Sequence, residues 1–237
     1  MAYDWQNRAA ARPATWAEVD AGLRQYMLRV YNYMGAGLAL TGLVAYFASA
    51  SGFYQAIYRT PLMWVVMLAP LGMVFFLSFR IQRMSLGAAQ ATFWVYAGSV
   101  GLSLAGIFLV YTGMSIASTF LITAAMFLAT SLYGYTTGRD LAGVGSFMFM
   151  GLIGIMIAML VNVFLASPGL QFAISVIGVI VFTGLTAWDT QRIKEMYTAQ
   201  DDGTIAGKKA IMGALALYLD FLNLFLFMLQ FMGQRRN

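Results

Sequence analysis

The segments AWDTQRI (residues 187–193) and ALYLDFLNLFLF (residues 216–227) decide how this chain is organised. The first places Asp189 at the end of a long apolar run, and the second places Asp220 inside the next run. A carboxylate in hydrocarbon costs about 2.5 to 3.5 kcal/mol on insertion scales, so such residues are rare and usually mark a pathway or a proton relay. Two such carboxylates facing each other would form a site whose protonation and charge change with pH.

The composition indicates an integral membrane protein. Of the 237 residues, 61% are hydrophobic and only 10% are charged, and the mean hydropathy is +0.74. An ordinary soluble domain is roughly 45–50% apolar. The apolar runs are each close to the roughly 20 residues that a helix needs to cross the hydrocarbon. We therefore expect an all-α membrane protein with seven transmembrane helices.

The residue types that are missing limit the chemistry. The chain has no Cys and no His, which removes thiolate nucleophiles, imidazole bases and the usual zinc ligands. The basic residues are spread over loops and do not form one patch, so nucleic acid is not an expected partner despite the net charge of +5. We expect no enzyme activity, no cofactor and no metal site.

The chain divides into an N-terminal arm, residues 1–29, and a seven-helix transmembrane domain, residues 30–237. Thr15 and Glu18 have the form of a capping box, which predicts either a short interfacial helix in the arm or the first turns of a longer first span. The seven expected spans are 30–49, 62–79, 89–110, 116–135, 144–165, 172–188 and 210–232.

Lys and Arg near the helix ends predict the orientation, because positively charged loops stay in the cytoplasm. One side collects Arg8, Arg12, Arg24, Arg29, Arg80, Arg83, Arg139, Arg192, Lys194, Lys208 and Lys209; the other collects only Arg59, Arg235 and Arg236. The N-terminus is therefore predicted to be cytoplasmic and the C-terminus outside. The Arg235–Arg236 pair leaves a re-entrant last segment as the alternative.

Three further polar residues are candidates for the site. Asn223 shares a helix face with Asp220, because the two are three residues apart. Asn162 in the fifth span is either a partner of the aspartates or a packing residue. Arg80 ends the second span on the side where Asp189 lies, so it is either a site residue or a positive-inside anchor.

At AWDTQRI and ALYLDFLNLFLFMLQ the sequence resembles the Bax inhibitor family of transmembrane proteins, in its bacterial branch. The resemblance extends to RQYMLRVYNYMGAGLALTG (residues 24–42), FMGLIGIMIAMLVNVF (residues 149–164) and SVIGVIVFTGLTAWDTQ (residues 175–191). It therefore covers nearly the whole chain from about residue 22.

The resemblance implies that helix 7 is central and is wrapped by helices 1 to 6 in two layers of three. It also implies a pH-governed Ca²⁺ leak pathway with Asp189 and Asp220 as the sensor, and Arg80 as the residue that competes for one of them. One departure is that some members carry an acidic residue three turns before this arginine, where the present chain has Ala69 in LAPLGMVFFLSFR.

The leading hypothesis is a pH-sensitive cation leak in the bacterial inner membrane, gated by an aspartate pair that shares a proton. Its expected partners are membrane lipid and a cation in transit. It requires the sixth span to continue as helix to about Lys194, so that the two carboxylates reach the same depth.

The alternative is a regulatory protein that binds another membrane protein, such as a quality-control protease. An intramembrane aspartyl protease is disfavoured, because no Gly precedes Asp220 to loosen the helix.

Overall fold

The computed structural model describes residues 16–236, with the side chains of residues 16–19 left undescribed. The N-terminal arm up to Thr15, including half of the expected capping box, lies outside the described residues. The described chain is helical almost throughout. Its elements are α1 (Trp16–Ala50), α2 (Phe53–Ile57), α3 (Leu62–Arg80), the 3₁₀ turn η1 (Ile81–Arg83), α4 (Leu86–Leu104), α5 (Ile107–Val110), α6 (Gly113–Thr136), α7 (Ala142–Leu165), α8 (Pro168–Glu195) and α9 (Gly203–Met232).

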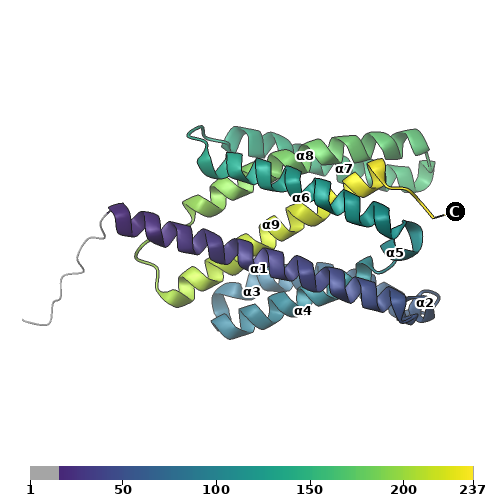
Figure 1. Cartoon of the computed structure of the whole chain (residues 1–237), viewed down its shortest axis with the longest axis horizontal. Helices are drawn as coiled ribbons and strands as arrows, with labels where there is room; N and C mark the ends of the chain where they lie inside the picture. The colour runs from purple at the N-terminus through teal and green to yellow at the C-terminus, as the bar shows by residue number, and fades with distance from the viewer. Residues whose placement is uncertain (1–15, 237) are drawn as a thin grey trace, which may run out of the picture.

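Seven segments of the described chain are helices long and apolar enough to cross a membrane. They correspond to α1, α3, α4 with α5, α6, α7, α8 and α9, so the prediction of seven transmembrane helices is confirmed. The last segment is one continuous helix of 30 residues. Figure 1 shows that α9 runs the length of the bundle and that the C-terminus lies at the end opposite the start of α1. This arrangement is that of a full crossing and not of a re-entrant segment.

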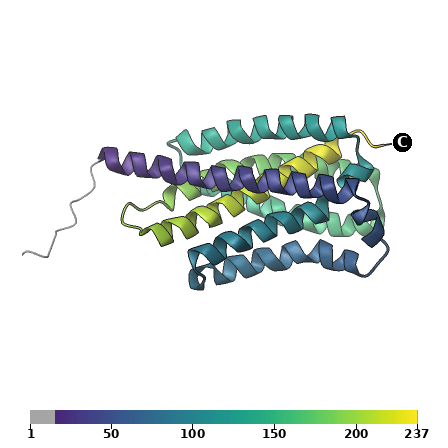
Figure 2. The same ribbon diagram turned by 60° about the horizontal axis from the view of Figure 1, so that its bottom comes forward.

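Six helices form two groups around α9. In one group α4 packs against α1 and α3, and in the other α8 packs against α6 and α7. Helix α9 runs diagonally between them and contacts α1, α4, α6 and α8 (Figures 1 and 2). Its most apolar window is 72% buried, against 11% for the windows of α3 and α7. The expected central seventh helix, with three helices on each side, is confirmed.

The central position of α9 follows from the residues that it presents to both groups. Leu217, Tyr218 and Leu224 are fully buried, and Ala210, Ala214 and Gly213 keep the backbone of α9 close to its neighbours. Apolar faces gain little from leaving lipid, so close packing and hydrogen bonds hold such helices together. The Thr41 hydroxyl, for example, lies 2.6 Å from the Tyr218 hydroxyl and donates to the Ala97 carbonyl at 2.9 Å. These contacts join α1, α4 and α9.

Two expected boundaries differ from the structure in ways that matter for the site. Helix α1 begins at Trp16 and runs without a break to Ala50, so the segment before residue 30 is the start of a longer helix and not a separate interfacial one. Helix α8 extends to Glu195, well past the expected end at residue 188. This extension confirms the requirement that the sixth span continue to about Lys194.

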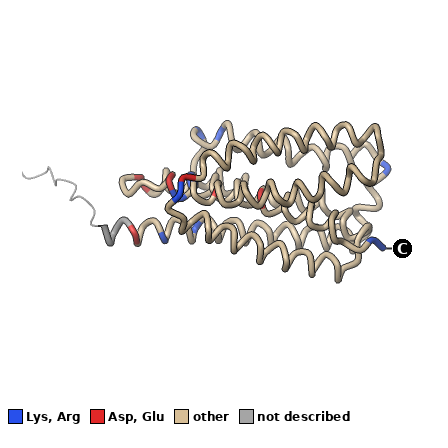
Figure 3. The backbone as a smooth tube through the Cα atoms, turned by 90° about the horizontal axis from the view of Figure 1, so that it is seen from above, with Lys and Arg blue, Asp and Glu red and all other residues tan. Residues whose placement is uncertain are grey.

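Charged residues gather mainly at the end of the bundle where α1 begins (Figure 3). Hydrogen bonds tie the loops of this end together: Lys208 donates to the Gln82 carbonyl at 3.2 Å, and Gln191 donates to the Arg139 carbonyl at 2.8 Å. At the opposite end the Arg236 amide donates to the Val110 carbonyl at 2.9 Å. The loops that the charge count assigned to one side therefore lie together.

Candidate functional site

The carboxyl groups of Asp189 and Asp220 meet between α8 and α9, within hydrogen-bonding range of each other. Asp220 is only 4% exposed, and its Oδ2 atom is buried with no donor among the described residues. A proton shared between the two carboxyls would supply that missing donor, because a protonated carboxyl group donates one hydrogen bond. The structure thus brings together the two aspartates that the sequence analysis selected.

Helix α6 fixes the turn of α8 that carries Asp189. Gly134 lies so close to α8 that a methyl group there would overlap the carbonyl of Ala187. The neighbouring Thr190 hydroxyl donates to the Thr186 carbonyl at 2.7 Å and lies 2.9 Å from the Ser131 hydroxyl. The rotation of α8 about its axis is therefore set on one side of Asp189 by the backbone contact with Gly134 and by the hydrogen bonds of the Thr190 hydroxyl.

Gln191 fastens the same turn to the loop between α6 and α7. Its side-chain oxygen accepts from the Leu141 amide at 2.8 Å, while its nitrogen donates to the Arg139 carbonyl at 2.8 Å. The residue is 8% exposed. A buried amide with both ends satisfied acts as a rigid link. Sequence reasoning missed this residue, although an amide two residues after Asp189 was a visible signal.

A cavity of ≈ 720 Å³ begins at the aspartate pair and is bounded by α3, α7, α8 and α9. Its wall is mostly Leu, Ile, Met and Phe, and its charged or amide side chains are Asp189, Arg192, Asp220, Asn223 and Gln230. Asp220, Asn223 and Gln230 recur on one face of α9, and ten residues of helix correspond to about 15 Å. The cavity therefore runs from the pair toward the opposite end of the bundle.

The structure places Arg192, and not Arg80, next to the pair. Arg192 lines the cavity and acts electrostatically on Asp189, and its guanidinium carbon lies 5.5 Å from the centre of the Trp188 ring. Arg80 is an exposed residue at the end of α3 and is not among the cavity-lining residues. In this conformation the arginine singled out by the resemblance stands apart from the aspartates. From α3 only Leu71 lines the cavity, so α3 adds no carboxylate.

The two asparagine candidates differ. Asn223 lines the cavity one turn from Asp220 and donates to the Leu219 carbonyl of its own helix at 2.8 Å. Asn162 lies in the last turn of α7, where its side chain accepts from the Ser167 amide at 3.0 Å and donates to Gln171 at 3.1 Å. Gln171 in turn donates to Gln230 at 2.7 Å. Asn162 therefore belongs to a polar cluster at the far end, which includes Gln171 and Gln230, two residues that the sequence analysis did not select.

Taken together, these features define a class of protein: a seven-helix membrane bundle in which a buried carboxylate of the central helix, Asp220, meets a second carboxylate, Asp189, of the neighbouring helix α8. A family model described as "Inhibitor of apoptosis-promoting Bax1" matches residues 23–237. The chain belongs to this family, the Bax inhibitor family, as the resemblance predicted. It is 51% identical over 219 residues to protein RP147 of Rickettsia prowazekii, with 92% of this chain and 93% of the relative covered. It is 49% identical over 220 residues to the inner membrane protein YbhL of Escherichia coli, covering 91% and 94%.

Proposed function

We propose that this protein is a pH-sensitive leak channel for cations, with Ca²⁺ as the cation of first choice. The observation that carries the proposal is the contact between Asp189 and Asp220 at one end of a cavity that continues along α9. The similarity to an Escherichia coli protein named as an inner membrane protein supports the bacterial inner membrane as its location. The N-terminus would then be cytoplasmic by the distribution of Lys and Arg.

The chemistry of the pair suits a gate for a hard cation. Ca²⁺ prefers oxygen ligands, above all carboxylates and amide carbonyls, and Asp189, Asp220 and Asn223 supply both kinds around the same cavity. Two carboxylates in a low-dielectric site cannot both ionise cheaply, so at acidic pH they hold one proton between them. Losing that proton adds a negative charge and a repulsion between the helices. Either change would alter how a cation enters the cavity.

The test is Ca²⁺ entry into dye-loaded proteoliposomes, measured from acidic to mildly alkaline pH. Wild type should show a pH-dependent flux, and Asp189→Asn and Asp220→Asn should each shift or flatten the profile because either change removes the shared proton. The double variant should add little to either single variant, since residues that act as one unit are not additive. Asn is nearly isosteric with Asp, so each variant should elute as a monodisperse protein in detergent.

Asp140→Asn provides the matched control. Asp140 is an exposed carboxylate in the loop before α7, away from the cavity, and it accepts from the Ala142 amide at 2.8 Å. The same loss of one charge there should leave the flux profile unchanged. A wild-type profile in a well-folded Asp220→Asn protein would contradict the proposal and leave the pair a purely structural contact.

The alternative function, docking onto another membrane protein, depends on residues 1–15 as the segment that the partner would bind. Those residues lie outside the described part of the chain.

A further inference from the structure

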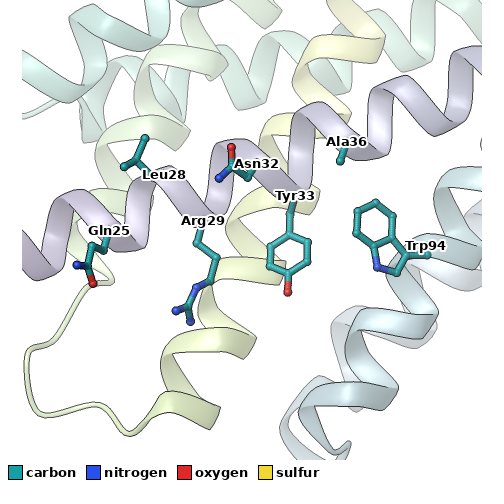
Figure 4. Close-up of a pocket in the computed structure, with 7 residues that line it drawn as sticks. All are labelled: Gln25, Leu28, Arg29, Asn32, Tyr33, Ala36 and Trp94. Atoms are coloured by element: carbon teal, nitrogen blue, oxygen red, sulfur yellow. The ribbon is translucent and has the colours of Figure 1, made fainter.

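A second hollow, of ≈ 540 Å³, lies on the outer side of α1 near the end where that helix begins. One face of α1, from Gln25 to Ala36, forms most of its lining, and Trp94 of α4 completes it. Figure 4 shows Gln25, Arg29 and Tyr33 pointing to the same side of α1, with Trp94 opposite Tyr33. This hollow shares no lining residue with the cavity of the aspartate pair.

The polar side chains of the hollow are available to a ligand. Gln25, Arg29 and Asn32 are exposed, and among the described residues their side chains make no hydrogen bond or ion pair within the protein. All three can donate hydrogen bonds, and Arg29 adds a permanent positive charge. Among the side chains that the structure describes, none that lines the hollow is acidic. A ligand that fits this set carries negative charge and several acceptor oxygens.

The hollow changes from polar to apolar along α1. Gln25, Arg29 and Asn32 occupy its first two turns, whereas Ala36 and Trp94 form its inner part. The Trp94 ring is held in place by Tyr33 and Phe93, with ring centres at 5.9 Å and 5.3 Å, and Tyr33 accepts from Gln90. Trp and Tyr are enriched at the level of lipid headgroups, where one part of the ring is apolar and another is wet. Along the hollow, the side chains thus change from polar to apolar in the same order as a lipid does from its headgroup to its acyl chain.

We propose that this hollow binds the headgroup of an anionic phospholipid from the leaflet in which α1 begins. The guanidinium of Arg29 pairs with the lipid phosphate, as guanidinium groups do with phosphates elsewhere, and Gln25 and Asn32 donate to its remaining oxygens. The first methylenes of an acyl chain lie against Ala36 and Trp94. By the charge distribution this leaflet is the cytoplasmic one, where basic pockets between helices take such headgroups.

A lipid accounts for the whole hollow, whereas a free anion accounts for only part of it. The rim belongs to the lipid-facing surface, with Leu28 52% exposed and the neighbouring Val95 of α4 62% exposed. A soluble phosphate would satisfy Arg29 but leave the apolar part next to Trp94 uncovered. An acyl chain covers that part and stays in contact with the surrounding bilayer.

The test compares two phospholipids with identical acyl chains, phosphatidylglycerol and phosphatidylcholine, titrated into the purified full-length protein in detergent. Bound lipid is counted by native mass spectrometry. Phosphatidylglycerol should bind more tightly, and Arg29→Gln should weaken its binding about fivefold, which corresponds to about 1 kcal/mol for one basic residue near the surface. Arg29→Lys should retain most of the affinity because it keeps the charge.

Arg24→Gln is the matched control, because Arg24 is exposed on the same helix but lines a different hollow, between α1 and α6. It should bind phosphatidylglycerol as wild type does. The proposal is overturned if the two lipids bind equally, if Arg24→Gln weakens binding as much as Arg29→Gln, or if soluble glycerol phosphate competes as well as the lipid does. An unchanged elution profile and melting temperature without lipid show that each variant is folded.

Discussion

At the scale of single residues, Asp220 stands out as the one charged residue type in the buried part of the described chain. It lies eleven residues past Lys209 on one continuous helix, which corresponds to about 16 Å, and it is almost fully buried. Among the described residues that line the cavity, Asp189 is the other acidic side chain and Arg192 the one cationic side chain. A carboxyl group retained at such a place needs a partner for its charge or for its proton. Asp189 is the neighbouring group that can share its proton, and Arg192 in turn acts electrostatically on Asp189.

The position of Arg192 leads to a prediction about which arginine tunes the pair. Replacing Arg192 with Gln removes a positive charge that favours ionised carboxylates, so the midpoint of the pH-dependent flux should move to higher pH. Arg80→Gln should move it less, because Arg80 is exposed and lies outside the cavity. The measurement is the proteoliposome flux profile of both variants. A larger shift for Arg80→Gln would mean that the conducting conformation brings α3 to the pair.

At the scale of elements, the contact between α6 and α8 depends on small residues. Gly134 of α6 faces the backbone of α8 at Ala187, whereas Gly154 of α7 has open space where a side chain would begin. The backbone atoms of α8 cannot move aside to make room for an added side chain at Gly134, as a flexible side chain could. The close approach at Gly134 is therefore what brings the Asp189 turn of α8 into its place.

We predict that Gly134→Ala destabilises the bundle while Gly154→Ala does not. The added methyl group would push α6 away from α8 at a cost of about 1 to 3 kcal/mol, the usual range for overpacking. At Gly154 the same change should be neutral or stabilising by about 0.5 to 1 kcal/mol, because Ala is the better helix former. Thermal unfolding in detergent, followed by the loss of helical circular dichroism, measures both. Equal melting temperatures would show that α6 and α8 are free to separate slightly.

At the scale of the whole molecule, the fold is two groups of three helices packed around a central one, and an odd number of crossings places the start of α1 and the end of α9 at opposite ends of the bundle (Figure 1). The distribution of Lys and Arg then predicts which end is cytoplasmic.

A reporter fused after Asn237 should therefore read as extracytoplasmic, and one inserted at Asp201 and Asp202 should read as cytoplasmic. Alkaline phosphatase and a fluorescent protein that matures only in the cytoplasm make a suitable pair of reporters, because each is active on one side only. Both reporters active on the same side would be incompatible with α9 as a complete crossing.

The class of the protein, the number of spans and the two intramembrane aspartates could all be predicted from the sequence. Each of these depends on a local property: the length of an apolar run, or a carboxylate within one. The expected ends were less accurate where polar residues continue a helix beyond the hydrocarbon. Helix α8 continues through the polar segment TQRIKE (residues 190–195). A hydropathy pattern marks only the apolar part of a helix, so it does not predict such a polar extension.

The residues that surround the aspartate pair could not be predicted from the sequence, because they come together only through packing between helices. The lateral position and rotation of each helix are set by contacts between elements distant in the sequence, such as Gly134 with Ala187 and Gln191 with the loop before α7. These contacts place Arg192 in the cavity with Asp189 and Asp220 and leave Arg80 on the surface. They also separate Asn162, which completes a turn, from Asn223, which lines the cavity. A sequence pattern gives the face of a helix on which a residue lies, but packing decides what that face meets.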